Sequence, residues 1–379
     1  MTNLPMGTIE QLPSQNTDCL QIPCSDLYRR KSILVTGAGG SIGSVLCKQL
    51  LSFAPRRLVL FDLSEFALYT MLRQLEEPAA AQQVELVPIL GSVSDAQLVR
   101  QALHSFAVDH VFHAAAYKHV PLAETNAVVS VSNNVLGTLT VARESGRFGV
   151  QHMVLISSDK AVRPTNVMGA SKRLAELTCQ YQQDLSPETT FHIVRFGNVA
   201  GSSGSVLPLF EQQVRQGGPI TLTHPAMRRY FMSVQNAVDL VLGSSCFAHP
   251  GDILVLDMGD PVHIKDLARR VIEAAGKTVR DTNHPQGDIE IKITGLRPGE
   301  KLCEEMSLTG VLHQTAHAKI LCAKDPPLST VLAAAMLRDV QNAVASFDHD
   351  RVVEVLKTWV EGFQTCHISA LPHATIESR

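Results

Sequence analysis

The sequence predicts an α/β protein in which a doubly wound parallel sheet carries a smaller C-terminal substrate-binding domain. Two features support this prediction. From Ser32 to Phe196, short apolar runs typical of buried strands alternate with amphipathic helical patterns, as expected when helices cover both faces of a parallel sheet. After Leu207 this regular alternation ends, which indicates that the chain leaves the sheet and builds a second unit.

The first predicted strand leads into a nucleotide site. Ser32–Thr36 runs directly into Gly37-Ala38-Gly39-Gly40-Ser41-Ile42-Gly43, and a helical pattern follows. In this Rossmann-type context, glycines let the backbone approach a pyrophosphate, and the helix amino terminus attracts its charge. The second predicted strand, 58–61, ends at Asp62. An acid there binds the adenosine ribose 2′-hydroxyl and repels a 2′-phosphate, so the sequence favours NAD over NADP.

The predicted strand 153–156 precedes the most reactive residues. The triplet Ser158-Asp159-Lys160 follows it, at the carboxyl end of a strand, where open α/β sheets bind their ligands. In the helical pattern that comes next, Met168 and Lys172 are four residues apart and therefore share a face. Further strands are predicted at 84–90, 110–113, 191–196 and 253–256, and helices at 235–247, 264–275 and 328–363.

Composition excludes several classes of protein. The 379 residues include 33 basic and 36 acidic side chains, a net charge of −3, so no basic field suggests nucleic acid as a partner. No apolar run approaches the length of a membrane span, and the first residues do not resemble a secretory signal. The eight cysteines include no Cys-x-x-Cys pair; we predict reduced thiols, a cytoplasmic location and no metal site.

These patterns divide the chain into four parts. The predicted parts are an N-terminal extension (1–30), an NAD-binding domain (31–197 plus about 233–262), a smaller substrate-binding domain (198–232 plus 263–325) and a helical C-terminal tail (326–379). The tail carries an apolar stripe but no chemistry-bearing motif, so it is expected to serve packing or a homo-oligomer interface.

The motifs together resemble the extended short-chain dehydrogenase/reductase superfamily, and within it the CapD-like nucleotide-sugar 4,6-dehydratases. These enzymes share the Ser/Thr-Asp-Lys triplet, here at 158–160, and a run similar to Gly295–Leu302. The superfamily's Tyr-x-x-x-Lys has Met168 in place of tyrosine, a replacement also found in some CapD-like members. Larger members carry a membrane region before a comparable leader, so this chain is expected to be a soluble form.

The resemblance implies a 4,6-dehydration of a nucleoside-diphosphate sugar, with UDP-N-acetylglucosamine favoured. C4 is oxidised with hydride transfer to NAD⁺, water is eliminated across C5 and C6, and the hydride returns to C6. Ser158 would hydrogen-bond the C4 oxygen, Asp159 would be the acid at C6, and Lys160 the base at C5. Lys172 would bind the nicotinamide ribose. Because Met168 cannot accept a proton, deprotonation of O4 is left to a water or to Asp159.

The same resemblance implies two sets of contacts. Cofactor contacts are expected from Gly37, Gly40, Ser41, Ile42, Gly43, Asp62, Ser64, Ser92, Val93, Ala114, Ala115, Ala116, Lys118 and Lys172. Substrate contacts are expected from Lys118, His119, Asn198, Val206, Arg229, Arg297 and Glu300. Relatives commonly carry an aspartate at the position of Ser92 that reaches the adenine amino group, so this contact is expected to be weakened or altered.

Three alternatives stay open. The first is a UDP-sugar 4-epimerase, which oxidises and re-reduces C4 without an acid at C6; the Asp159-Lys160 pair argues against it. The second is the same dehydration on a GDP-linked or other nucleotide-linked sugar. The third is a catalytically inactive NAD-binding regulator, which the missing tyrosine suggests and the retained Ser158 and Lys172 disfavour.

Overall fold

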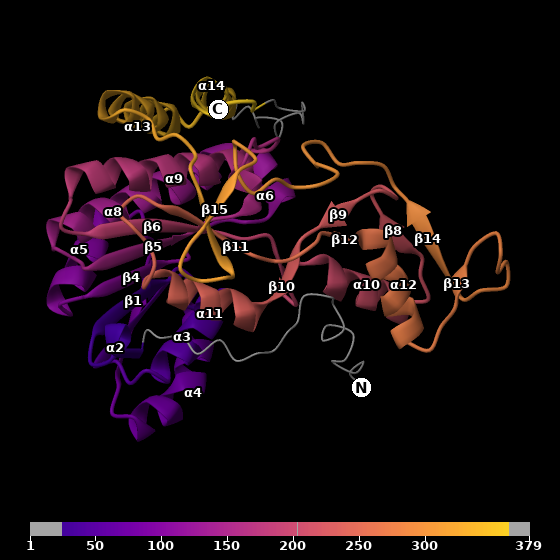
Figure 1. Cartoon of the computed structure of the whole chain (residues 1–379), viewed down its shortest axis with the longest axis horizontal. Coiled ribbons are helices and arrows are strands. Elements are labelled where there is room, and N and C mark those ends of the chain that lie inside the picture. The colour runs from indigo at the N-terminus through magenta and orange to yellow at the C-terminus, as the bar shows by residue number, and fades with distance from the viewer. Residues whose placement is uncertain (1–24, 203, 364–379) are drawn as a thin grey trace, which may run out of the picture.

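The structure, a computed structural model, describes residues 25–202 and 204–363. Its centre is a nine-stranded sheet in the order β15-β16-β11-β6-β5-β4-β1-β2-β3 (Figure 1). The strands are β1 Ser32–Thr36, β2 Arg57–Asp62, β3 Glu85–Leu90, β4 His110–His113, β5 His152–Ile156, β6 Thr190–Arg195, β11 Ile253–Leu256, β15 Leu312–Gln314 and β16 Ile320–Ala323. From β3 through β11 neighbouring strands are parallel, so the predicted doubly wound parallel sheet is confirmed.

Helices cover both faces of this sheet because each buries one apolar stripe against it. On one face, α3 (Gly43–Leu51), α4 (Glu65–Ala81) and α11 (Val234–Ser244) share a core with the strands. On the other face, α5 (Ala96–Ser105), α8 (Gly137–Arg147) and α9 (Val167–Leu185) do the same. The chain order reverses between β1 and β4, and that switch point opens the crevice in which this class of sheet binds ligands.

The C-terminal helices form an outer layer on α9 (Figure 1). The sequence predicted one helical stretch over 328–363, whereas the structure has α13 (Thr330–Ala345) and α14 (His349–Trp359). The break falls at Phe347, whose φ of +53° is left-handed and ends a helix. The buried faces of both helices pack on α9 and α7 (Ala127–Val131), so packing accounts for the apolar stripe. The oligomeric state stays a prediction.

A smaller unit projects beyond the carboxyl edge of the sheet (Figure 1). It contains α10 (Val206–Arg215), β8 (Ile220–Leu222), β9 (Arg228–Arg229), β12 (Val262–His263), α12 (Ile264–Ala274), β13 (Val279–Arg280) and β14 (Ile289–Ile293). These elements enclose a core of their own. A parallel pair, β7 (Asn198–Ala200) and β10 (Phe231–Ser233), joins the unit to the sheet.

The predicted boundary of the smaller domain needs one correction. The sequence predicts that residues 263–325 belong to it, but β15 and β16 within that range belong to the main sheet. β16 pairs antiparallel with β11, because β11 otherwise leaves an unpaired edge and β16 offers the buried apolar residues to cover it. Most of the predicted extension (1–30) and the end of the tail lie outside the described residues.

Three further findings bear on the class of protein. Within 25–202 and 204–363, no helix is both long and apolar enough to cross a lipid bilayer, and no cluster of three or more His, Cys, Asp or Glu side chains suits a metal ion. Cys47, Cys179, Cys303 and Cys322 are free thiols. Cys246 is disulfide-bonded, so the prediction of reduced thiols throughout is wrong at that position.

Candidate active site

The glycine loop between β1 and α3 is packed so closely that side chains cannot replace its glycines. Gly37 has φ +66°, and a Cβ there would lie 2.8 Å from the amide nitrogen of Ala115. A Cβ on Gly43 would lie 2.0 Å from the carbonyl oxygen of Gly37. The loop therefore brings bare backbone to the amino end of α3, which is the arrangement that accepts a pyrophosphate.

Asp62 lies where an adenosine ribose contact requires an acid. It closes β2, and its Oδ2 accepts from the Gly39 amide at 2.8 Å while its Oδ1 accepts from the Ser64 amide at 2.9 Å. The carboxylate is thus tied to the glycine loop and to the start of α4, which Ser64 caps through the amide of Ala67. These residues fit the ribose of a dinucleotide.

The structure separates the two residues predicted after β3. Ser92 lies just past that strand, at the same sheet edge as Asp62, and its hydroxyl accepts from the amide of Ser94 at 3.2 Å. Val93 is 3 % exposed and packs in the core, where a Cβ on Gly137 would meet it at 2.9 Å. The Val93 side chain therefore belongs to the core rather than to an open surface.

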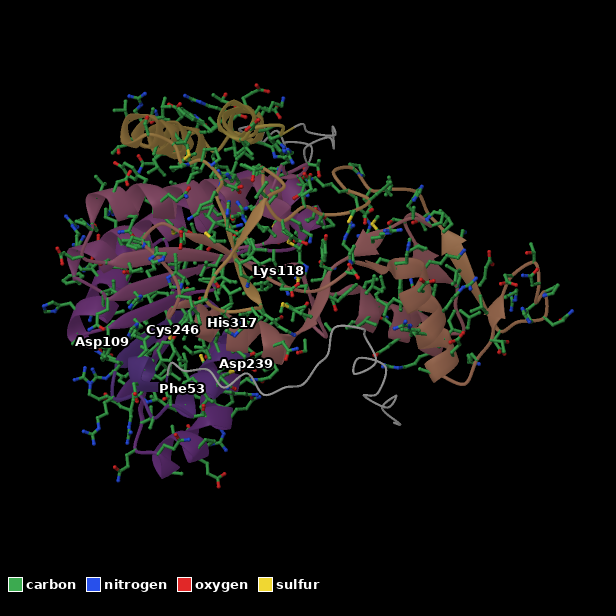
Figure 2. All side chains as sticks on the ribbon, viewed as in Figure 1. Phe53, Asp109, Lys118, Asp239, Cys246 and His317 are labelled. Atoms are coloured by element: carbon green, nitrogen blue, oxygen red, sulfur yellow. The ribbon has the colours of Figure 1, made fainter. Side chains whose placement is uncertain are left out.

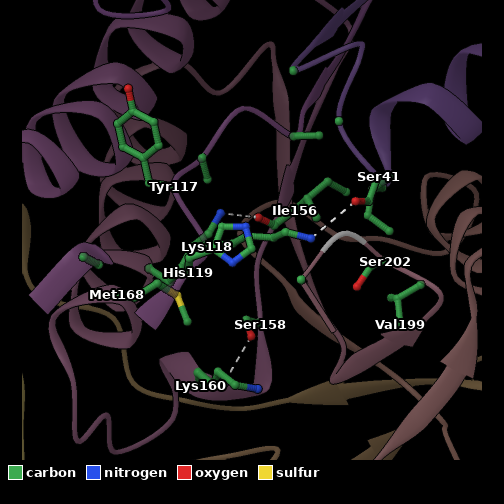
Figure 3. A pocket seen from close by; sticks show the side chains of 18 of the residues that line it. Ser41, Tyr117, Lys118, His119, Ile156, Ser158, Lys160, Met168, Val199 and Ser202 are labelled. Atoms are coloured by element: carbon green, nitrogen blue, oxygen red, sulfur yellow. Dashed lines mark hydrogen bonds between the residues drawn. The ribbon is translucent and has the colours of Figure 1, made fainter. Parts of the chain in front are cut away.

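A cavity of about 620 Å³ runs from the glycine loop across the carboxyl edge of the sheet. Figure 3 shows Lys118 and His119 facing Ser158, Lys160 and Met168 across this space, with Tyr117 turned away from them. The predicted site residues that line it are Gly37, Gly40, Ser41, Ile42, Gly43, Ala114, Ala116, Lys118, His119, Ser158, Lys160, Met168, Lys172 and Asn198. Most predicted cofactor contacts and most predicted catalytic side chains thus share one cavity.

Asp159 is the exception among the predicted catalytic residues. It is fully buried, at 0 % exposed, and the described residues that line the cavity do not include it. Its Oδ1 accepts from the Ser158 hydroxyl at 2.9 Å and from the Lys160 ammonium at 3.0 Å. Its Oδ2 is buried and has no hydrogen-bond partner among the described residues. Any contact between Asp159 and a ligand must therefore pass through one of its two neighbours.

Lys160 is the link between this buried acid and the open cavity. The Lys160 side chain is 20 % exposed, and its ammonium also donates to Asn198 Oδ1 at 3.2 Å. Asn198 begins β7, which leads toward the smaller unit. One ammonium group thus touches the strand-end triplet and the segment that continues into the second unit.

Lys172, on α9, lies at the floor of the cavity. It is 7 % exposed, and its ammonium donates to the carbonyl oxygen of Ile156 at 2.9 Å. Burial lowers its pKa to about 8, although Glu176 and Cys179 act in the opposite direction. Met168, one turn earlier on α9, is 3 % exposed and lines the cavity. The predicted Met168–Lys172 face therefore points at the cavity.

Asn134 holds the loop that carries Tyr117 and Lys118 against α9. It lies in a π-helical turn, Ser132–Leu136. Its amide accepts from the backbone nitrogen of Tyr117 at 2.8 Å and donates to the carbonyl oxygen of the same residue at 3.0 Å. It also donates to the hydroxyl of Ser171, at 2.9 Å. Asn134 therefore positions the loop that brings Lys118 to the cavity, where the Lys118 ammonium donates to Ser41 at 3.3 Å.

A second cavity of about 440 Å³ continues from the first into the smaller unit. Both cavities are lined by Lys118, His119, Lys160, Asn198, Gly204 and Ser205. Figure 2 shows Lys118 near the centre of the molecule, between the main sheet and the smaller unit. The other predicted substrate residues, Val206, Arg229, Arg297 and Glu300, line the second cavity. The predicted cofactor and substrate residues therefore occupy two adjoining halves of one crevice.

The helix and the loop on either side of this crevice are tied together. Asn166 Oδ1 accepts from the amide of Gly169 and so caps α9, at 2.8 Å. The Asn166 amide group also donates to the carbonyl oxygen of Gly299, at 3.2 Å, and Thr165 donates to the same oxygen at 2.8 Å. The loop with Arg297 and Glu300 is thus joined to the helix with Met168 and Lys172.

Two carboxylates in the second cavity were not predicted. Glu304 is 7 % exposed, and Glu124 accepts from the backbone nitrogen of Val167 at 2.5 Å. Glu304 comes four residues after Glu300, but the segment between them is not helical, so this spacing does not predict a shared face. Nothing in the sequence around Glu124 marks it, because its partner lies at a helix start 43 residues away.

Comparisons with known proteins show the family of this chain. The family model described as "Polysaccharide biosynthesis protein" matches residues 33–325. The Staphylococcus aureus capsular polysaccharide biosynthesis protein CapD is 44 % identical over 295 residues, which are 78 % of this chain and 48 % of CapD. The chain therefore spans about half the length of that relative. A UDP-glucose 4-epimerase of Rickettsia massiliae is 34 % identical over 284 residues, 74 % of this chain and 78 % of the epimerase.

A solved structure has the same fold. It is the dTDP-glucose 4,6-dehydratase DesIV from Streptomyces venezuelae, determined with NAD bound. It superposes with a TM-score of 0.62 at 22 % identity, covering 72 % of this chain and 87 % of that one. The family match and the relatives assign the chain: it belongs to the CapD-like polysaccharide biosynthesis family, within the short-chain dehydrogenase/reductase superfamily.

Proposed function

We propose that this protein is an NAD-dependent nucleotide-sugar 4,6-dehydratase, a hydro-lyase, with UDP-N-acetylglucosamine as the favoured substrate. The observation that carries the proposal is the continuity of the two cavities at Lys118, Lys160 and Asn198. A cofactor at the glycine loop and a nucleotide sugar in the smaller unit would meet beside Lys160. Homology to CapD and the NAD found in DesIV support the same reading.

The residues around the glycine loop fit NAD. Bare backbone at Gly37 and Gly43 would receive the pyrophosphate, Asp62 the adenosine ribose, and Lys172 the nicotinamide end. When bound, NAD would supply the hydride acceptor at C4 and the hydride donor at C6. Met168 fills the space of the usual tyrosine without accepting a proton, so removal of the O4 proton falls to a water or to Asp159.

The buried pair Asp159–Lys160 would carry the elimination. With 3.0 Å between Asp159 Oδ1 and Lys160 Nζ, one proton can move from the ammonium to the carboxylate, leaving a neutral amine and a carboxylic acid. The amine then removes the C5 proton. The acid supplies the proton for the departing C6 hydroxyl, relayed through Ser158, which is 2.9 Å from Asp159 and lines the cavity. Atoms balance, because one proton leaves C5, one reaches the C6 oxygen, and water departs.

A UDP-sugar 4-epimerase is the second candidate, because a Rickettsia enzyme of that name is 34 % identical. Mass spectrometry of the product formed from UDP-N-acetylglucosamine separates the two. Loss of one water supports dehydration, and unchanged mass with a new isomer supports epimerisation. No turnover with any nucleotide sugar would favour an NAD-binding regulator. GDP-linked sugars in the same assay test the nucleotide. A cytoplasmic location, a homo-oligomer and the domain functions stay predictions.

A further inference from the structure

Arg229 lies between two carboxylates in the second cavity without a close contact to either. Its Nη2 is 3.8 Å from Glu300 Oε1 and 3.8 Å from Glu304 Oε1. Its Nη1 is occupied, because it donates to the backbone carbonyl oxygens of Arg228 at 2.7 Å and Leu302 at 3.2 Å. These two bonds fix the orientation of the guanidinium. Its Nη2 faces two carboxylates but is too far from either for a short, charge-assisted hydrogen bond.

The two acids differ in their surroundings. The Glu300 side chain is 23 % exposed, whereas that of Glu304 is 6 % exposed. Burial raises the pKa of the Glu304 carboxyl. Four nearby charges also act on this pKa. Asp159, which follows β5, raises it. Three cations lower it: Lys160 beside Asp159, Arg229 on β9, and Lys301 on the same loop as Glu304. Burial therefore favours the neutral form of the Glu304 carboxyl, as it does for Glu124, which lines the same cavity.

We propose that Glu304 takes up one proton when the diphosphate of a nucleotide sugar binds beside Arg229, so that substrate capture and protonation of this carboxyl are coupled. The proposal rests on the proposed function, since it requires a diphosphate at Arg229. It adds a role for a residue that lies outside the Gly295–Leu302 motif. The proton comes from the solvent, and no other reactant is needed.

The physical reason is the local charge balance. A bound diphosphate would bring two negative charges to a guanidinium that already faces two carboxylates. Like charges in a partly buried cavity disfavour one another's ionised form. Glu300 keeps more of its hydration, so Glu304 relieves the repulsion by accepting a proton. Its neighbour Glu305 is unsuited to this role, because burial is outweighed there by Lys301 and Arg163, which hold its pKa below the usual range.

Proton uptake can be measured directly in the wild-type protein. Isothermal titration calorimetry with UDP-N-acetylglucosamine is run at one pH in buffers of different ionisation enthalpy, which gives the number of protons bound. This diester has no ionisation of its own near neutral pH, unlike free UDP. Uptake approaching one proton is expected, with a Kd that rises by up to about tenfold per pH unit on the alkaline side. Binding without proton uptake at every pH from about 5.5 to 8.5 would overturn the coupling and leave the proposed function intact. Burial shifts carboxyl pKa values into about this window.

Variants identify the group. Glu304→Gln should bind with no proton uptake and a flat pH profile, whereas the matched control Glu305→Gln should keep both wild-type properties. His119 also lines the cavity, so His119→Gln is the second comparison and should still take up a proton. Uptake that persists in Glu304→Gln and vanishes in His119→Gln would transfer the role to the histidine. If no nucleotide sugar binds at any pH, the proposed function fails together with this inference.

Discussion

Two arginines in this molecule each face two acidic side chains, and the difference between them separates scaffold from site. Arg195, on β6, is 0 % exposed and makes bonds of 2.7 and 2.6 Å to Glu176 and of 2.6 Å to Asp325. Arg229 stands 3.8 Å from both of its acids. The first guanidinium has its donors saturated within the protein, whereas the second retains the capacity to bind an anion.

The surroundings of Arg195 show what the saturated arrangement does. Ser157, which precedes the reactive triplet, donates to Glu176 at 2.6 Å, and Asp325 accepts from the amide of Leu308 at 2.8 Å. Arg195 also donates to the carbonyl oxygen of Met306, at 3.2 Å. The network thus joins β5, β6 and α9 to the segment that follows the Arg297–Glu300 loop. Its function is to hold the floor of the crevice.

The largest expected effect comes from breaking the saturated network. Arg195→Ala would leave Asp325 buried without a counter-charge and Glu176 with Arg173 alone, 3.0 Å away. Removing one partner of a buried ion pair typically costs about 3–5 kcal/mol of stability. Urea unfolding followed by circular dichroism measures this loss. Arg229→Ala is the comparison in the same experiment. Arg229 is also buried but stands 3.8 Å from both of its acids, so the unfolding free energy should fall by less than in Arg195→Ala. Equal losses in both variants would remove the distinction between the two arginines.

The second expected effect is on turnover. Proton transfer by a positioned group typically contributes about 10²–10⁴-fold to the rate, so Asp159→Asn and Lys160→Ala should each lose that factor in dehydration. Oxidation at C4 needs no acid at C6, so Asp159→Asn should accumulate NADH absorbance while little water is eliminated, provided that a water removes the O4 proton. If Asp159 removes that proton, the variant should form neither NADH nor product. If both variants dehydrate at near wild-type rates, the assignment fails and the 4-epimerase becomes the better reading.

Arg229→Ala should weaken substrate binding. The matching test at Arg195 is not informative, because loss of that residue destabilises the fold. A hydrogen bond to a charged group contributes about 1.5–3 kcal/mol, which corresponds to roughly 10–150-fold in the Kd of UDP-N-acetylglucosamine. Calorimetry of ligand binding gives this value, and NAD affinity, measured in parallel, should stay unchanged because Arg229 lines only the second of the two cavities described above. Unchanged substrate affinity would show that Arg229, although 3.8 Å from both carboxylates, does not bind the anionic part of the substrate.

Buried histidines provide a second case in which burial changes the behaviour of a charged side chain. The pKa of a free histidine is near neutral. His110 and His192 are 1 % and 0 % exposed, and burial lowers their pKa values to about 4 and about 3. Below the unfolded-state pKa of about 6.5 the unfolded chain binds more protons than the folded chain. Stability should therefore fall as pH drops from about 6.5 to 4, by roughly 1 kcal/mol per pH unit for each histidine.

Chemical denaturation at a series of pH values measures this slope. His192→Asn should reduce the slope by the share of one histidine, and the exposed His249→Gln is the matched control that should leave it unchanged. A wild-type slope of zero across this window would mean that these rings do not stay neutral in the folded protein.

The smallest effect is expected at Met168. Its side chain lines the cavity but can neither donate nor accept a proton, so Met168→Ala should retain dehydration within roughly tenfold of wild type, less than a general acid or base contributes. Product formation under single-turnover conditions measures it. Complete loss with intact fold and NAD binding would mean that the thioether shapes the pocket rather than merely filling it.

Local patterns predicted the first half of the molecule well. β1, the glycine loop and Asp62 are contiguous in sequence, so strand, turn and acid could be read together and the structure agrees. The triplet at 158–160 was likewise predicted at a strand end. What sequence did not reveal was that Asp159 turns inward while Lys160 turns toward the cavity, because neighbouring residues at a strand end can face either way.

Long-range partners account for the other misses. β16 pairs with β11, some 65 residues earlier in the chain, and Glu304 meets Arg229 across a similar separation. Neither pairing leaves a periodic signal in the sequence. Burial decides whether the pKa of the Glu304 carboxyl is shifted. The elements that bury this side chain come from distant parts of the chain, and their arrangement in space could not be predicted from the sequence.

Asn166 has a consequence for regiochemistry. Since it caps α9 and also holds the carbonyl oxygen of Gly299, the loop that would grip the nucleotide and the helix beneath the sugar keep a fixed spacing. A sugar anchored by its diphosphate would then present the same ring carbon to the hydride acceptor in every turnover. The choice of C4 over C3 or C2 would be set by a length, measured from the nucleotide anchor, rather than by recognition of each hydroxyl.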